Sequence, residues 1–159
     1  MKFYIKQKVI SLKDRFNVYD ENQNVKYTVK GKYFSLLNKL KLLDEHEELI
    51  YHAEKKLFRL LPKYIIFDTN HTQLATIKKQ LALRPRYEIF MHDKKLNIDG
   101  TFLGHNFTIS DESGSLASIH KKYISWGDTY EIDIFNETYL NLILFIVIVI
   151  DQTLHERKH

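Results

Sequence analysis

The chain of 159 residues contains no cysteine, only two prolines and only five glycines. The lack of cysteine excludes disulfides, thiolate metal sites and cysteine nucleophiles, and it fits a reducing compartment. No apolar stretch of signal-peptide length follows the first residues, so we expect a cytoplasmic protein. An excess of one charge is also lacking, because 24 Lys and Arg against 20 Asp and Glu give a net charge of +4. This balance permits polyanionic partners without requiring them.

Catalytic and metal-binding motifs are missing as well. The segment His46–Glu48 begins like a zinc-protease helix but lacks the second histidine. The eight histidines are scattered singly, without the spacing of metal ligands. No glycine-rich phosphate loop occurs, and Ser113–Ser115 lacks the strand-to-helix context of a nucleophile elbow. We therefore predict a protein that is not an enzyme and that uses no cofactor and no metal.

Aromatic residues are abundant, and they recur in a pattern with a period of about 24 residues. Each copy begins with two large apolar residues on either side of a third residue, as Phe16 and Val18 flank Asn17. The equivalent pairs are Leu40 and Leu42, Tyr64 and Ile66, Tyr87 and Ile89, Phe107 and Ile109, and Tyr130 and Ile132. Alternation with a period of two is typical of a strand with one face buried.

A polar stretch rich in Asp and Asn follows most copies, and a second alternating segment comes after it. Asp20–Asn24, for example, precedes Val25, Tyr27 and Val29, and Leu49 takes the place of Val25 in the next copy. Short polar side chains favour turns, so each copy predicts a hairpin with these residues on the core face. Six such units give about twelve antiparallel strands, which most simply close into a barrel because closure removes exposed edges. A solenoid of stacked repeats is the structural alternative.

The segment from Leu140 to Ile150 is apolar except for Asn141. A membrane-spanning helix needs about 20 apolar residues, and this run stops at Asp151, so we predict no transmembrane segment. A buried strand is one alternative, but Asn136 or Thr138 can cap a helix and no helix breaker follows. A helix that is apolar all round has to be surrounded, as a closed barrel allows. We therefore predict a mainly β, single domain over residues 1–159, with a barrel over 1–135 and a buried central helix over 136–156.

Several segments carry a family resemblance over nearly the whole chain: Lys6–Phe16, Leu60–Tyr64, Arg84–Tyr87, Lys121–Tyr130 and the apolar tail that ends at Asp151. Together they are similar to bacterial LURP-one-related proteins. The resemblance implies a tubby-like fold, a twelve-stranded barrel threaded by a hydrophobic helix, with kinship to phosphoinositide-binding tubby domains and to phospholipid scramblases. Scramblases place an acidic calcium motif before their last helix, whereas Asp128, Glu131 and Asp133 are spread through a strand here. The resemblance therefore does not extend to calcium-driven lipid movement.

Lysines stand at one position of the repeat in successive copies. Lys55, Lys79 and Lys121 each lie between apolar residues that are expected to face inward. An inward ring of ammonium groups would form an anion site, because charges removed from water need a partner. The alternative is a bulge that reverses the phase and returns these lysines to solvent. Lys30 and Lys32 lie near the same end of the barrel, so we expect this end to be basic in either case.

These observations favour a non-enzymatic binding module at the membrane periphery. Its basic end, with Lys30, Lys32, Lys55, Lys79 and Lys121, would bind anionic phospholipid head groups or a similar phosphate ligand. A nucleic-acid-binding module or a regulatory protein-interaction module is the alternative, although the sequence has no recognisable helix or stacking motif for reading nucleic acid. An enzyme or a carrier would need a sizeable polar cavity beside the central helix, where little room is expected.

Overall fold

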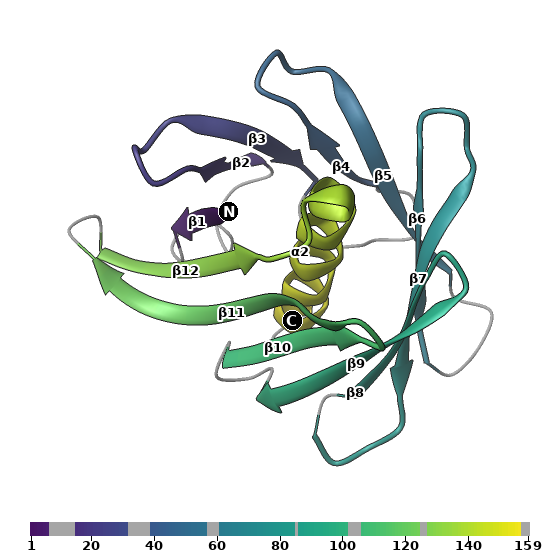
Figure 1. Cartoon of the computed structure of the whole chain (residues 1–159). Helices are drawn as coiled ribbons and strands as arrows, with labels where there is room; N and C mark the ends of the chain where they lie inside the picture. The colour runs from purple at the N-terminus through teal and green to yellow at the C-terminus, as the bar shows by residue number, and fades with distance from the viewer. Residues whose placement is uncertain are drawn as a thin grey trace.

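The strands form one closed antiparallel barrel (Figure 1). The computed structural model describes residues 1–6, 15–31, 39–56, 61–84, 86–101, 106–124 and 127–156. The strands are β1 (Lys2–Lys6), β2 (Arg15–Tyr19), β3 (Val25–Lys30), β4 (Leu40–Leu43), β5 (Leu49–Lys56), β6 (Lys63–Phe67), β7 (Gln73–Gln80), β8 (Arg86–Met91), β9 (Lys94–Thr101), β10 (Asn106–Asp111), β11 (Gly114–Ile124) and β12 (Gly127–Ile134). Each strand pairs with its neighbours in the chain, and β12 pairs with β1. The predicted fold class is confirmed.

The barrel closes through a pairing between the two ends of the strand region. Five of the predicted two-strand units are hairpins of consecutive strands, from β2–β3 to β10–β11. The strand of the sixth unit, β12, pairs instead with β1, and Phe3 lies opposite Ile132 and Ile5 opposite Tyr130. Phe3 and Ile5 are buried, so β1 supplies both the last edge and part of the core. The leading apolar pairs of all six copies are buried, as their alternation predicts.

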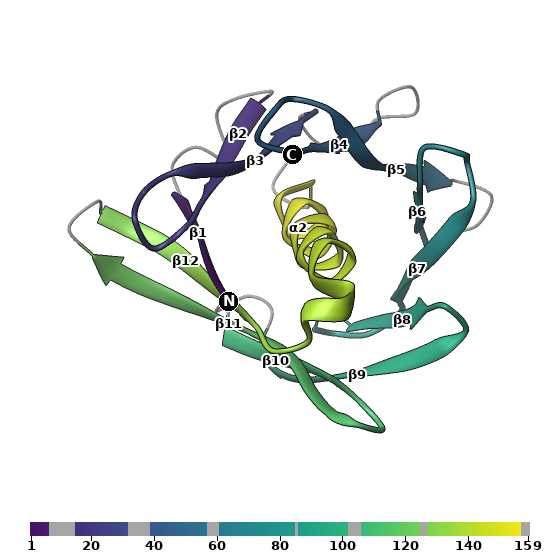
Figure 2. The same cartoon turned by 45° about the horizontal axis from the view of Figure 1, so that its top comes forward.

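A single helix fills the barrel (Figure 2). A short 3-10 turn, η1 (Glu137–Tyr139), leads into α2 (Leu140–Glu156). The Asn136 side chain accepts a hydrogen bond of 3.0 Å from the backbone N–H of Thr138, so Asn136 is the cap among the two predicted candidates. Every residue from 142 to 154 is buried. The helix is therefore surrounded on all sides, as its uniformly apolar sequence requires.

The central helix is also long enough to be compared with a membrane-spanning helix. Glu137–Leu154 is long and apolar enough to cross a bilayer by length and composition alone, but 67% of this stretch is buried inside the barrel. The inward rows of the strands supply the apolar surface that covers it. Ring contacts such as that of Tyr51 with Phe145, whose centroids lie 6.3 Å apart, show this packing between wall and helix.

Three hairpin turns repeat one hydrogen-bonded structure. In each of them an aspartate, Asp20, Asp44 or Asp68, accepts two bonds of 2.8 to 2.9 Å from backbone N–H groups two and four residues later. The residue three positions after the aspartate has a positive φ of 61 to 63°, and these residues are Gln23, Glu47 and His71. The short aspartate side chain thus fixes each turn locally, as its position in the repeat predicts.

Bulges beside the turns correct one prediction. The strand register shifts next to four turns, between Val18 and Tyr19, Leu42 and Leu43, Ile66 and Phe67, and Ile109 and Ser110. An inserted residue reverses which face of the sheet the following side chains meet. The prediction that Val25 and Leu49 face the core is therefore wrong, and both are 39% exposed.

The two ends of the barrel differ in their connections. The hairpin turns at residues 20–24, 44–48, 68–72, 92–93 and 112–113 lie at one end, here called the turn end. The opposite end, here called the lysine end, is where β3, β5 and β7 finish and where β2, β6 and β8 begin. The helix runs from the turn end to the lysine end. Near its start the Tyr27 hydroxyl bonds Asn141, and near its finish the Tyr87 and Thr153 hydroxyls lie 2.6 Å apart.

Candidate anion-binding end of the barrel

Three predicted site lysines lie directly opposite tyrosines that face the barrel interior. Lys55 lies opposite Tyr64, Lys79 opposite Tyr87 and Lys121 opposite Tyr130 across antiparallel strands. Residues opposite each other point to the same face of a sheet, and all three tyrosines are buried. The Lys55 ammonium lies 5.9 Å from the centre of the Tyr64 ring. The structure thus brings the three lysines to one end of the barrel in the inward phase, while the bulges lie near the turns.

The last turns of α2 place polar groups at the same end. Asp151, Gln152 and Thr153 are buried, in contrast to the apolar residues before them. The C-terminus of a helix also carries a partial negative charge from its unpaired carbonyl groups. The inward lysines therefore lie at the end of the barrel that holds the negative end of the central helix and the buried Asp151. Their charges complement the helix end before any ligand is considered.

A second set of cations lies on the outer wall. Arg15, Lys30 and Lys41 are direct cross-strand neighbours on β2, β3 and β4. Lys56, Lys63 and Lys78 are direct neighbours on β5, β6 and β7. Like charges in direct register destabilise a sheet. The second row ends at a carboxylate, because Lys78 lies opposite Glu88 on β8.

Carboxylates neutralise only part of this charge. Glu54 lies 2.9 Å from the Lys39 ammonium and 3.2 Å from that of Lys56, and Glu47 pairs with Arg15. Burial by itself would raise the pKa of Glu54, but the bonds from Lys39 and Lys56 hold it below its usual value. Among the described residues of the lysine end, six lysines make no ion pair: Lys6, Lys30, Lys41, Lys63, Lys78 and Lys121. The lysine end therefore keeps an uncompensated positive charge.

One carboxylate on β12 is held from two sides. Glu131 is nearly buried on the outer wall, where the Tyr4 hydroxyl donates to it at 3.0 Å and Lys122 lies at 2.9 Å. Burial together with the bond to Glu131 raises the pKa of Tyr4 to about 12. For Glu131 itself burial opposes ionisation, but Lys122 and Tyr4 keep its pKa below the usual value. This cluster connects β1, β11 and β12, so it stabilises the part of the sheet where β1 and β12 close the barrel.

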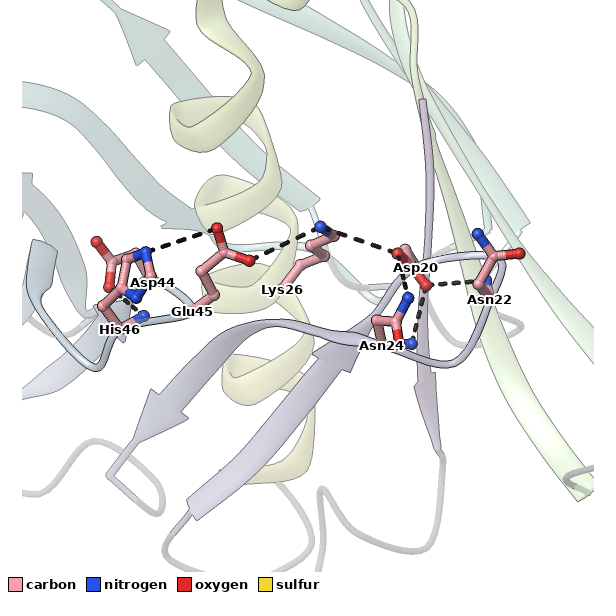
Figure 3. Close-up of polar contacts among 7 residues, drawn as sticks. All are labelled: Asp20, Asn22, Asn24, Lys26, Asp44, Glu45 and His46. Atoms are coloured by element: carbon pink, nitrogen blue, oxygen red, sulfur yellow. Dashed lines mark hydrogen bonds and ion pairs between the residues drawn. The ribbon is translucent and has the colours of Figure 1, made fainter.

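The turn end carries the opposite charge, and Figure 3 shows three of its carboxylates, Asp20, Asp44 and Glu45, in two neighbouring turns. Acidic residues follow one another through the turns and the adjoining strand ends, and they are Asp20, Glu21, Asp44, Glu45, Glu47, Glu48, Asp68, Asp93, Asp111, Glu112, Asp133 and Glu137. Lys26 bridges two neighbouring turns, with its ammonium 4.0 Å from Asp20 and 3.7 Å from Glu45. The barrel is therefore polar along its axis, with an acidic turn end and a basic lysine end.

Among the residues that the structure describes, no group of three His, Cys, Asp or Glu side chains could hold a metal ion. The histidines of the outer wall are packed instead. The rings of His71 and Phe67 stack with centroids 4.1 Å apart, and His52 stacks on Phe67 at 5.2 Å. Burial, and then the positive charge of Lys39, lowers the pKa of His52, so its neutral form is favoured. This cluster is a packing feature of β5, β6 and the turn after β6.

The cavities differ in place and size. A cavity beside the helix, lined by Phe107, Tyr130, Val147 and Asp151 among others, holds about 10 Å³, roughly one water molecule. A larger hollow of about 490 Å³ lies between β8 and β9 and is lined by both cations and carboxylates, including Arg86, Glu88, Lys95 and Asp99. Pairing between these two strands is confined to Ile89–Met91 with Lys94–Leu96 in the described residues. A third hollow, of about 400 Å³, lies at the start of the helix and is lined by Tyr51, His92 and Asn141 among others. In the described residues, the interior beside the lysine end of the helix therefore has little room for a ligand.

The outcome for the predicted site residues is mixed. Lys30 is exposed on the outer wall, Lys55 and Lys79 are half-buried, Lys121 is exposed at the end of the barrel, and Lys32 lies outside the described residues. Sequence reasoning missed the row through Lys56, Lys63 and Lys78. Its members are far apart in the chain, and only the strand register shows that they are neighbours.

Comparisons with known proteins agree with the resemblance read from the sequence. A family model described as LURP-one-related matches residues 1–151. The chain is 32% identical to the uncharacterized protein YxjI of Bacillus subtilis (strain 168), an alignment that covers 98% of this chain and 94% of YxjI. An X-ray structure of a protein from Arabidopsis thaliana superimposes with a TM-score of 0.64 at 18% identity, over 94% of this chain and 90% of that one. At this identity the structural likeness shows the fold alone.

Proposed function

The chain belongs to the LURP-one-related family, and we propose that it is a non-enzymatic module that binds anionic phospholipid head groups through its lysine end. The observation that carries the proposal is the pair of like-charged rows, in which three cations stand side by side on adjacent strands. Proteins seldom keep a destabilising arrangement at one place unless it serves binding. Such rows of cations complement a surface that carries many negatively charged phosphates.

The distribution of the basic residues favours a flat, extended partner. Some of the lysines lie on the outer wall and others in the inward phase, all around one end of the barrel, so a wide surface can meet both sets at once. Each basic residue near an anionic membrane contributes about 1 kcal/mol, so four or five give measurable attachment that salt weakens. The acidic turn end would be repelled by the same membrane. The polarity of the barrel therefore selects one orientation.

The test is a titration of the purified protein with vesicles of phosphatidylcholine alone and of phosphatidylcholine mixed with phosphatidylserine. We expect binding to the mixed vesicles only, and a loss of binding at high salt. Replacing Lys30, Lys63, Lys78 and Lys121 together with Gln is expected to weaken binding by about two to three orders of magnitude, at about 1 kcal/mol for each residue.

A matched control separates position from net charge. Replacing Lys2, Lys26, Lys94 and Lys95 with Gln removes the same number of charges from the turn end. This variant is expected to bind mixed vesicles much as the wild type does. Equal losses in the two variants, or equal binding to neutral vesicles, would disprove the proposal. Binding of a DNA or RNA oligonucleotide at low salt without vesicle binding would instead assign the lysine end to nucleic acid.

A further inference from the structure

The loop between β7 and β8 carries the most exposed large apolar side chains of the described residues. Leu81 is 91% exposed and Leu83 is fully exposed. The other exposed large apolar residues are Met1, Val25, Leu49, Phe135 and Tyr139, which lie near the turn end and show 38 to 61% of their surface. Scattered exposure of single apolar residues is ordinary, but two leucines projecting from one short loop leave a concentrated apolar surface in water.

This loop lies within the basic surface described above. Lys78 and Lys79 precede it on β7, and Arg84 and Arg86 follow it. Lys78 belongs to the outer row with Lys56 and Lys63, so the leucines emerge beside that row. Leucines flanked by cations form the pattern of a segment that rests at a membrane interface, with apolar side chains among acyl chains and charges among head groups.

Resting on the proposed function, we propose that Leu81 and Leu83 insert into the acyl region of an anionic bilayer while the neighbouring Lys and Arg residues bind its phosphates. Charge complementarity selects this occupant. Nucleic acid has phosphates but no apolar layer for leucine, and proteins that hold single strands offer aromatic rings for stacking instead. A bilayer surface presents both chemistries, with phosphates outside and hydrocarbon just beneath.

The cysteine-free chain permits a direct test. Leu83→Cys is labelled with the environment-sensitive fluorophore NBD, and Asn70→Cys in a turn of the opposite end serves as the control. With phosphatidylcholine–phosphatidylserine vesicles, NBD at position 83 is expected to shift its emission to the blue and brighten several-fold. Quenching by lipids that carry a nitroxide on the acyl chain is also expected. NBD at position 70 is expected to remain in water throughout.

A pair of unlabelled variants measures the contribution to affinity. Leu81→Ser with Leu83→Ser is expected to weaken binding to mixed vesicles by roughly 10- to 100-fold. Val25→Ser with Leu49→Ser removes exposed apolar surface from the turn end and is expected to leave binding unchanged. Because both pairs lie on the surface, circular dichroism should show the same fold for each.

The outcomes separate this inference from the proposed function. If the protein binds mixed vesicles while NBD at position 83 stays in water, insertion is disproved and head-group binding stands. If no vesicles bind, both fail. If the blue shift appears without vesicles as protein concentration rises, the leucines form a contact between copies of the chain, and insertion is likewise disproved.

Discussion

The two ends of the barrel are built from the same repeat but are stabilised in different ways. At the turn end, aspartate side chains accept backbone N–H bonds within each hairpin, so charge and local geometry support each other. At the lysine end, cations stand beside cations across neighbouring strands, and charge opposes pairing. The hairpins of the turn end are thus stabilised locally, whereas the lysine end keeps cross-strand repulsion that Glu47 and Glu54 relieve only in part.

We expect the largest loss of stability when glycine is replaced by alanine, and the size of the loss should differ between a glycine at each end. Gly100 in β9 has a φ of +117°, and a Cβ there would lie 2.3 Å from the Asn106 carbonyl oxygen and 2.8 Å from the Phe107 Cα. Gly114 at the turn end has a φ of +127° but open space around it. Gly114→Ala should cost about 1–3 kcal/mol from backbone strain alone. Gly100→Ala should cost more than about 3 kcal/mol, because the backbone of β10 has to move as well. Urea unfolding measures both, and equal losses would contradict the account.

The next effect tests the local bonds of the turn end. Asp68→Ala removes the acceptor for the backbone N–H groups of Asn70 and Thr72, at 2.9 and 2.8 Å. We expect the free energy of unfolding to fall by about 1–2 kcal/mol, since each such bond contributes about 1 kcal/mol. Asp68→Asn keeps an acceptor oxygen and should recover most of that loss. If the Asn variant were as unstable as the Ala variant, charge rather than hydrogen bonding would hold the turn.

The lysine end should respond in the opposite direction. Lys63 lies between Lys56 and Lys78, so Lys63→Gln removes two like-charged cross-strand contacts. We expect a gain in unfolding free energy of about 0.2–1 kcal/mol, together with weaker binding to anionic vesicles. The gain should shrink at high salt, which screens the repulsion. A variant that is less stable than the wild type would show that the row is not under electrostatic strain.

A smaller effect concerns the pKa of one carboxylate at each end, because different groups lower the two values. The backbone N–H of Asn24 leads the groups that lower the pKa of Asp20, whereas Lys39 and Lys56 lower that of Glu54 against an opposing effect of burial. Both groups ionise more readily in the folded state. Their stabilisation is therefore present above the unfolded pKa values, near 3.8 and 4.5, and is lost as the pH falls through the lower folded values. In carboxyl NMR titrations, added salt should raise the pKa of Glu54 and leave that of Asp20 nearly unchanged. A salt-dependent Asp20 would remove the distinction.

The fold could be predicted from the sequence because it depends on local patterns. Alternation marked the strands, aspartates marked the turns, and the apolar run after Asn136 marked the helix. The exposure of Val25 and Leu49 could not be read in this way, since a bulge inserts one residue without any clear sequence signal. The cation row through Lys63 also required the register, which depends on how distant strands align. Leu81 is one of the apolar residues beside Lys79 that alternation predicts to face inward, and it is exposed instead. Polarity alone does not distinguish a buried leucine from a projecting one.

The central claim is that the lysine end, and not the turn end, meets an anionic surface. Hydrogen–deuterium exchange of the wild-type chain with and without phosphatidylserine-containing vesicles tests it without any substitution. We expect slower exchange over residues 81–84, at the start of β6 near Lys63 and at the end of β7 near Lys78. The turns at 20–24, 44–48 and 68–72 should not change. Slower exchange in those turns, or vesicle binding without slowing at the lysine end, would contradict it.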